Sequence, residues 1–256
     1  MNATVVVRGL TKTFFDESRG EVQAVAGIDF ECRAGEIFGL LGANGAGKTT
    51  TLRMLATILA PTTGSATVLG HDVAAAPEEV RRSLGFYSAS TALYPRLTAR
   101  ETLEFFARIN RYPADRVAAR VDALIDRFGI REYAGARVDK LSSGMKQKVS
   151  IARTVAHDPP VLIFDEPTVG LDVLNAIEMQ KIIREFRDES KTIIFSTHIM
   201  SEAEKLCDRI AIIHRGRIHA CDTLAALRAA TGAHYLEDIF VHYVHQAERD
   251  GAPAVA

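Results

Sequence analysis

Cysteine is scarce in this chain and forms no framework. The sequence of 256 residues contains three cysteines, Cys32, Cys207 and Cys221, which lie far apart and lack C-x-x-C spacing. An odd number of scattered cysteines argues against a disulfide or zinc framework and favours a reducing compartment.

Long apolar runs and an excess of one charge are also missing. No apolar run approaches the roughly 18 residues that a membrane helix needs, and the first residues lack the basic and apolar regions of a signal peptide. We therefore expect a soluble chain, so that any membrane span has to come from another chain. The formal net charge is −1, which gives no indication of nucleic-acid binding.

A glycine-rich stretch at residues 42–49 fits the phosphate-binding pattern G-x-x-x-x-G-K-[ST]. A buried-strand pattern at 37–41 precedes it and a helix pattern follows it, so a chance glycine-rich turn is the weaker interpretation. Backbone N–H groups and the helix N-terminus would bind phosphate, Lys48 would reach the β- and γ-phosphates, and the Thr49 hydroxyl would bind Mg²⁺. The residues expected to contact the nucleotide are Gly42, Asn44, Gly45, Ala46, Gly47, Lys48, Thr49 and Thr50.

Two acids follow the continuous apolar run at residues 161–164. Such a run suits the middle of a parallel sheet, and ligands of these sheets bind at the carboxyl ends of the strands. After a P-loop, Asp165 is the expected Mg²⁺ partner, and Glu166 is placed to orient or deprotonate the attacking water. His198 follows a further strand pattern at 192–197. A lone histidine is usually structural, but this position at the same edge favours contact with the ligand.

Two other stretches carry weaker signals. Phe14 lies ahead of the P-loop and is a candidate for stacking on adenine, worth about 1–3 kcal/mol, although a core phenylalanine is the commoner case. Phe15 must face the other way, so at most one of the two can stack. Residues 142–144 begin a helix and offer a hydroxyl and free N–H groups to an anion, although a serine there is more often only an N-cap.

The remaining patterns predict strands within residues 4–32 and a helical insertion at 88–158, with a capping box at Thr98 and Glu101. A short helix is expected after an Asp222 cap, then a last amphipathic helix and a disordered tail at 250–256. The helix that follows residue 172 is expected to face the core through Leu174, Ile177, Ile182, Ile183 and Phe186.

The order of these motifs resembles the nucleotide-binding subunits of ATP-binding-cassette (ABC) transporters over residues 4–220. Residues 141–144 are similar to the family's signature motif, 170–172 to its D-loop and His198 to its H-switch. The resemblance implies an α/β P-loop NTPase (RecA-like) core with a parallel sheet, an N-terminal antiparallel β-subdomain and an inserted helical subdomain. It implies an ATPase domain at 1–222, with the helical subdomain at 88–158, and a C-terminal helical extension at 223–256.

The resemblance also implies partners. Two cassettes, taken as a homodimer, would stack head to tail, so that ATP on one P-loop is covered by Ser142, Ser143 and Gly144 of the other. His198 would touch the γ-phosphate, and Asp172 would link the two sites. A polytopic ABC-2-type membrane permease would be a separate chain, which places the cassette at the cytoplasmic face of the membrane.

Three positions depart from the family pattern. The signature reads L-S-S-G-M in place of L-S-G-G-Q, and the adenine-stacking residue is Phe14 in place of tyrosine. The position of the Q-loop glutamine holds Ala89, which cannot coordinate Mg²⁺ or orient water. Either Ser88 or Ser90 substitutes for it, or the partner is coupled through backbone and shape.

Within the family, the stretches 92–98, 195–198 and 236–240 are similar to cassettes of sodium-efflux and drug-efflux exporters. Two alternatives are a non-transport ABC ATPase acting on the ribosome or DNA, and a regulatory module without turnover. The first usually carries a long coiled coil or a second cassette, and neither pattern is found here. The full set of Lys48, Asp165, Glu166 and His198 argues against the second.

Overall fold

An antiparallel sheet is built largely from the N-terminal residues. The computed structural model describes residues 3–17, 20–88 and 91–251, and within them four strands pair in the order β2-β1-β4-β5. Their bounds are Ala3–Asp16 for β1, Gly20–Arg33 for β2, Thr63–Val68 for β4 and His71–Asp72 for β5. The strands expected within residues 4–32 are thus present as a long hairpin.

The larger sheet carries the candidate site. Within the described ranges it has six strands in the order β10-β9-β3-β8-β7-β6, all parallel to their neighbours except β10. The bounds are Ile37–Leu41 for β3, Leu84–Ser88 for β6, Val161–Asp165 for β7, Thr192–Thr197 for β8, Arg209–His214 for β9 and Arg217–Asp222 for β10. Because β3, β8 and β7 are adjacent and parallel, the residues that follow them meet at one edge of the sheet.

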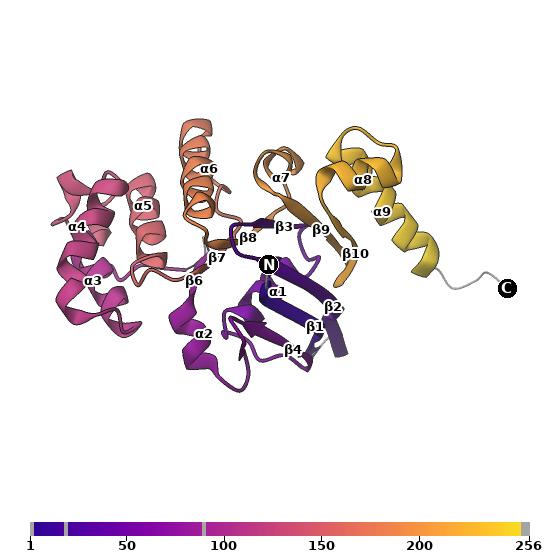
Figure 1. Ribbon diagram of the computed structural model, residues 1–256, viewed down its shortest axis with the longest axis horizontal. Coiled ribbons are helices and arrows are strands. Elements are labelled where there is room, and N and C mark those ends of the chain that lie inside the picture. The colour runs from indigo at the N-terminus through magenta and orange to yellow at the C-terminus, as the bar shows by residue number, and fades with distance from the viewer. Residues whose placement is uncertain (1–2, 18–19, 89–90, 252–256) are drawn as a thin grey trace.

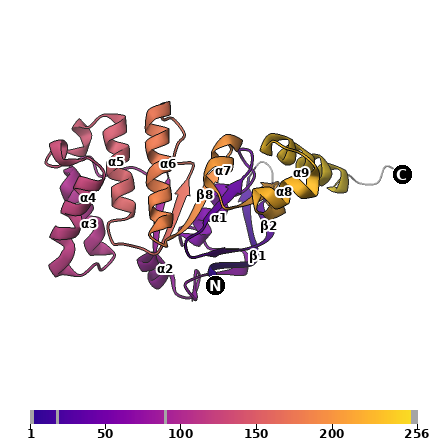
Figure 2. The ribbon, with the colours of Figure 1, turned by 45° about the horizontal axis from the view of Figure 1, so that its top comes forward.

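Helices pack around this sheet, and further helices lie at both ends of the molecule. Figure 1 shows α3, α4 and α5 grouped at one end of the molecule and α8 and α9 at the other, and Figure 2 shows the same separation. The bounds are Lys48–Leu55 for α1, Pro77–Ser83 for α2, Ala99–Ile109 for α3, Val117–Arg127 for α4, Ser143–Thr154 for α5, Val173–Asp188 for α6, Met200–Leu206 for α7, Leu224–Thr231 for α8 and Leu236–Gly251 for α9. None of the described helices is long and apolar enough to cross a bilayer.

The core is divided by the large sheet. Alternate residues of a strand point to opposite faces, and β7 follows this rule. Leu162 and Phe164 pack in the cluster that includes α3–α6, whereas Val161 and Ile163 pack in the cluster that includes α1 and the antiparallel sheet. Both faces of β7 are therefore covered, which is why its sequence is apolar without alternation.

The helix starts follow from local sequence. Thr98 Oγ1 accepts from the N–H of Glu101, and a carboxylate oxygen of Glu101 accepts from the N–H of Thr98, so the capping box predicted for α3 is confirmed. The predicted Asp222 cap is wrong. Asp222 ends β10, and the Thr223 hydroxyl instead accepts from the N–H of Ala226 to begin α8.

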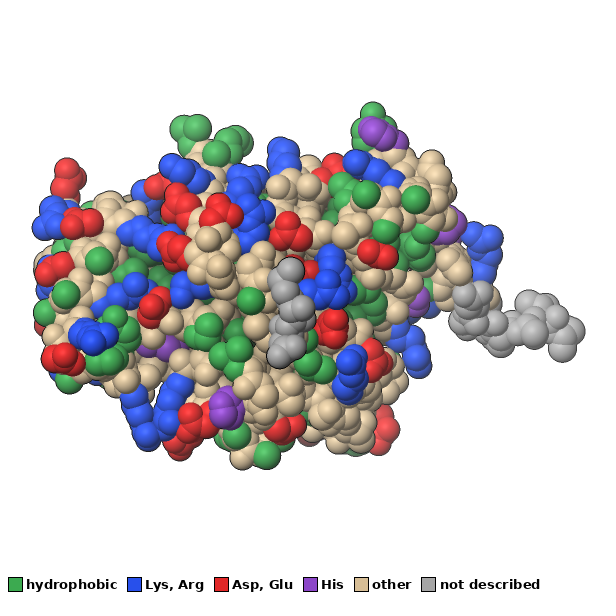
Figure 3. Space-filling model, viewed as in Figure 1, with side chains coloured by type: hydrophobic (Ala, Val, Ile, Leu, Met, Phe, Trp, Pro, Cys, Tyr) green, Lys and Arg blue, Asp and Glu red, His purple; other side chains and the backbone are tan. Residues whose placement is uncertain are grey.

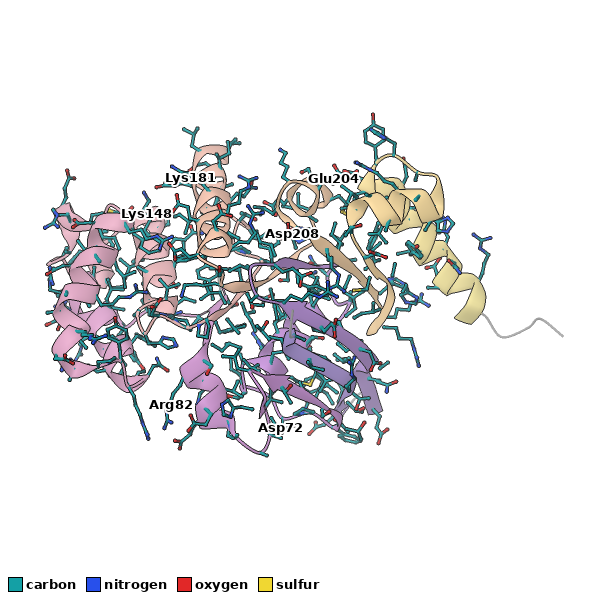
Figure 4. The ribbon with its side chains drawn as sticks, in the orientation of Figure 1. Asp72, Arg82, Lys148, Lys181, Glu204 and Asp208 are labelled. Atoms are coloured by element: carbon teal, nitrogen blue, oxygen red, sulfur yellow. The ribbon has the colours of Figure 1, made fainter. Side chains whose placement is uncertain are left out.

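The C-terminal helices are attached through α7. Glu204 accepts from the N–H of Leu236 at 3.1 Å and pairs with Arg228 at 3.3 Å, so one carboxylate contacts both α8 and the start of α9. Figure 4 labels Glu204 on the side of α7 that faces these helices. Leu236 and Ile239 are fully buried beneath this contact, which makes α9 a packed element.

The prediction that Leu174 and Ile177 face the core is wrong. The buried residues of α6 are Met179, Ile182, Ile183 and Phe186, all from its seventh residue onward, whereas Leu174 is 79% exposed and Ile177 56%. The first turn of α6 extends beyond the layer that covers the rest of it, and Figure 3 shows hydrophobic side chains gathered at this end. Apolar residues recur at helical spacing along the whole of α6, but neighbouring elements do not cover its first residues.

Candidate active site

The P-loop is the turn between β3 and α1. Gly47, with φ of 107°, caps the helix, and a β-carbon there would lie 2.6 Å from the carbonyl oxygen of Ala24. A β-carbon on Gly42 would lie 2.4 Å from the carbonyl oxygen of Ile213. Both glycines are therefore required by close backbone approach, in addition to the freedom that a phosphate nest needs.

Lys48 begins α1 and is 4% exposed. Its Nζ donates to the carbonyl oxygens of Gly42 at 2.7 Å and Ala43 at 3.2 Å, and it pairs with Glu166 Oε1 at 3.1 Å. The ammonium is thus held at the carboxyl edge of the sheet, facing the residue that follows β7.

Glu166 leaves the line of β7 through a left-handed backbone conformation. Its φ is 48°, which costs a non-glycine residue about 1–2 kcal/mol. The turn brings Oε1 to Lys48 and to within 3.2 Å of His198 Nδ1. Burial raises the pKa of the Glu166 carboxyl, but hydrogen bonds from His198 and Lys48 outweigh burial and hold the pKa below its usual value. Glu166 is therefore an ionised carboxylate, as a base requires.

Asp165 is buried beside the start of α1. Its Oδ1 accepts from Thr49 Oγ1 at 3.2 Å and from Ser196 Oγ at 2.7 Å. A threonine hydroxyl and a carboxylate in contact are oxygen ligands of the kind that Mg²⁺ prefers. The residues at this position fit a divalent cation.

The structure separates the signature motif from these residues. Ser142 caps α5 by accepting from the N–H of Met145 at 3.3 Å, as expected of a serine at a helix start. In Figures 1 and 2, α5 lies with α3 and α4, away from α1 and the P-loop. Ser143 lines a cavity of about 560 Å³ with Tyr87 and Gln147, whereas Lys48 of the P-loop contacts Glu166.

The other predicted residues have local contacts. Asp172 caps α6 by accepting from the N–H groups of Leu174 and Asn175. Phe14 is 38% exposed, with Lys12 Nζ 5.2 Å from its ring centroid, and Phe15 is 80% exposed. Ala89 and Ser90, on which the Q-loop interpretation depends, lie outside the described residues.

Two polar side chains with contacts at the site were missed from the sequence. Ser196 Oγ donates to Asp165 and accepts from the N–H of Glu166 at 3.1 Å. Gln147 of α5 donates to the carbonyl oxygen of Pro167 at 3.0 Å, which links α5 to the loop after Glu166. The available signal for Ser196 was a hydroxyl that follows the apolar middle of β8, near the carboxyl end of the strand.

The parallel sheet, the P-loop and the ionised Glu166 at its carboxyl edge define the class of P-loop nucleotide-hydrolysing proteins. The model of one family, described as ABC transporter, matches residues 25–169. The ATP-binding protein NatA of Bacillus subtilis (strain 168) is 41% identical over 228 residues, which are 89% of this chain and 93% of NatA. The chain therefore belongs to the ABC transporter family.

Another relative and two solved structures are also similar to this chain. The daunorubicin/doxorubicin resistance ATP-binding protein DrrA of Streptomyces peucetius is 38% identical over 214 residues, which are 84% of this chain and 65% of DrrA. The structure of an ABC transporter ATP-binding subunit has a TM-score of 0.85 at 29% identity and covers 94% of this chain and 99% of its own. A dimeric cassette bound to ADP and Pi has a TM-score of 0.77 at 24% identity, with 86% and 98% covered, and supports the fold. The predicted α/β P-loop fold is confirmed.

Proposed function

We propose that this chain binds and hydrolyses Mg·ATP and thereby powers transport through a separate membrane protein. The observation that carries the proposal is that Lys48 and His198 meet on one oxygen of Glu166 beside the P-loop. A fixed cation, an ionised base and a histidine at one point are the groups that γ-phosphate hydrolysis requires.

Each predicted residue has a role in this proposal. Thr49 and Asp165 hold Mg²⁺, which neutralises charge on the phosphates. Glu166 orders the attacking water and accepts its proton, while Lys48 and His198 stabilise charge on the γ-phosphate. Phe14 stacks on adenine. The backbone and side chains that cradle the phosphates belong to Gly42, Asn44, Gly45, Ala46, Gly47, Lys48, Thr49 and Thr50.

The working unit is a dimer of two copies of this chain. The signature residues Ser142, Ser143 and Gly144 lie at the start of α5, and α5 is grouped with α3 and α4 away from α1, so a second copy supplies them to the nucleotide. Asp172 lies on the loop that joins the catalytic strand β7 to α6, where it can link the two sites. Cassettes of this fold have been solved as dimers.

The partner is a polytopic ABC-2-type permease at the cytoplasmic face of the membrane, and the direction of transport is export. The support is the likeness to NatA, to the drug-resistance protein DrrA and to the Nod factor export ATP-binding protein I of Paraburkholderia xenovorans (strain LB400), which is 41% identical over 214 residues. Na⁺ or a drug-like compound is the candidate substrate. Residues 1–222 form the ATPase domain, with the helical subdomain at 88–158, and 223–256 form a C-terminal extension.

The test is phosphate release by Glu166→Gln. Removing a general base slows the chemical step about 10²- to 10⁴-fold, so we expect release to fall by at least about 100-fold while ATP binding is retained. Glu178→Gln is the matched control, because Glu178 is an acid of α6 that pairs with Lys148 at 3.0 Å, and Figure 4 shows Lys148 on α5. Wild-type turnover in Glu166→Gln would contradict the role of this residue.

A further inference from the structure

The hydroxyl of Ser196 lies where β8 passes the carboxyl end of β7. Ser196 is fully buried and is paired with Asp165 in the parallel register of the two strands. We propose that Ser196 is a positioning residue for hydrolysis, and that its one hydroxyl holds both Asp165 and Glu166 and so sets the affinity of the site for its divalent cation. The inference rests on the function proposed above.

The Ser196 hydroxyl holds the carboxylate of Asp165. Ser196 Oγ donates its proton to Asp165 Oδ1 at 2.7 Å, and Thr49 Oγ1 donates to the same oxygen at 3.2 Å. Two hydroxyls on one carboxylate oxygen fix the rotation of the carboxylate. Hydrogen bonds from such supporting groups orient metal ligands, and their loss typically lowers metal affinity or activity 10- to 100-fold.

The same hydroxyl also holds the backbone of Glu166. A hydroxyl has one proton, and because that proton goes to Asp165, Ser196 Oγ can accept from the N–H of Glu166 at 3.1 Å. The same N–H also reaches the carbonyl oxygen of Ser196 at 3.2 Å. These bonds hold the left-handed turn, with φ of 48°, that aims the Glu166 carboxylate at Lys48 and His198. One residue therefore fixes the cation ligand and the base together.

The same strand provides a matched control. Thr192, the first residue of β8, is also buried, and its hydroxyl pairs with Thr4 Oγ1 at 2.7 Å at the opposite end of the strand. Thr192→Val removes a buried hydroxyl of β8 without touching the site. Any effect that comes only from loss of a buried hydrogen bond in this strand should appear equally in Thr192→Val and Ser196→Ala.

The experiment compares wild type, Ser196→Ala, Ser196→Cys and Thr192→Val as full-length chains. With a fixed concentration of a non-hydrolysable ATP analogue, the thermal midpoint is followed as Mg²⁺ is added, and the Mg²⁺ dependence of ATP hydrolysis is measured separately. We expect Ser196→Ala to need about 10-fold more Mg²⁺ for half of the thermal shift, and its kcat to fall about 10-fold. Analogue binding in EDTA and both properties of Thr192→Val should match wild type.

Ser196→Cys keeps the volume of the side chain but offers only a weak donor. It should resemble Ser196→Ala, and it replaces that variant if the alanine form does not fold. A wild-type Mg²⁺ midpoint in either folded variant, or an equal shift in Thr192→Val, would overturn the positioning role. If the wild-type chain itself shows no Mg²⁺-dependent shift with the analogue, the proposed function fails rather than the role of Ser196.

Discussion

His157 follows α5 where the chain turns toward β7. Burial lowers the pKa of this histidine to about 4. The unfolded chain, in which histidine has a pKa near 6.5, takes up its proton at higher pH than the folded chain does. Protonation of His157 in the unfolded chain therefore lowers the free energy of unfolding as the pH falls from about 6.5 toward 4. The total decrease is about 3 kcal/mol, and above about pH 6.5 there is none.

The matching measurement is urea unfolding of wild type and His157→Phe between about pH 7 and pH 4.5. The variant should lose less stability than wild type over this window, because its unfolded state has one proton fewer to bind. His71→Gln, a change of an exposed histidine, should follow the wild-type curve. Parallel pH profiles for wild type and His157→Phe would contradict the prediction.

Single residues of the site were predictable where a motif and a strand end coincide. Lys48, Asp165, Glu166 and His198 were all located by such coincidences, and the structure brings them to one edge of the sheet. The role of Ser196 depends on the pairing of β7 with β8. Neither strand contains this information alone, because register between strands far apart in sequence is a property of the folded sheet.

At the scale of single elements, the capping box of α3 stabilises the start of that helix through contacts between near neighbours in the sequence. Thr98→Ala removes the acceptor for the N–H of Glu101, and we expect the free energy of unfolding to fall by about 1 kcal/mol. Thr98→Ser keeps the hydroxyl and should stay close to wild type in the same urea titration. Equal stability of the alanine and serine variants would show that the box contributes nothing.

The cap of α6 allows its structural and functional roles to be separated. Asn is as good an N-cap as Asp, so Asp172→Asn should keep the stability of wild type, whereas Asp172→Ala should lose about 1 kcal/mol. If Asp172 also links two sites, Asp172→Asn should reduce the cooperativity of hydrolysis with respect to ATP. Stability comes from urea unfolding and cooperativity from the ATP dependence of phosphate release. Unchanged cooperativity would leave Asp172 as a cap only.

α6 shows what periodicity cannot predict. The apolar spacing of Leu174, Ile177 and Ile182 is correct for one helix face, yet only the part of that face from Met179 onward is covered. Periodicity reports which side of a helix is apolar, and the length of the covering layer is decided by other elements. The exposure of Leu174 could therefore be learned only from the folded structure.

At the scale of the whole molecule, the proposed dimer predicts complementation between two inactive variants. Lys48→Ala damages the P-loop and Gly144→Asp damages the signature, so each variant alone should show background hydrolysis. In a mixed dimer, one site combines the intact P-loop of one chain with the intact signature of the other. An equal mixture should recover at most about a quarter of wild-type phosphate release, because half of the dimers are mixed and one of their two sites is intact; coupling between the sites lowers this value. A mixture as inactive as its components would exclude a shared site.

The general architecture was predictable because motif order restricts the topology. A P-loop between a buried strand and a helix, followed by further apolar strands, predicts a parallel sheet with its ligand at the carboxyl edge. The sequence did not predict that β3 lies between β8 and β9, with β10 as an antiparallel edge strand. These neighbours are set by packing among segments more than a hundred residues apart.

The contacts of Lys48 have a consequence for how nucleotide enters. An ammonium has three N–H donors, and those of Lys48 go to two carbonyl oxygens and to Glu166. A polyphosphate can therefore bind the Lys48 ammonium only by displacing one of these partners. Glu166, the anionic partner, competes with the phosphate for Lys48. Occupancy of the site is an exchange of one anion for another, so the measured affinity is the intrinsic one reduced by the fraction of chains in which the lysine is released. When a phosphate takes the place of Glu166 on Lys48, the carboxylate keeps its contact with His198 and has an oxygen free to accept a proton from water.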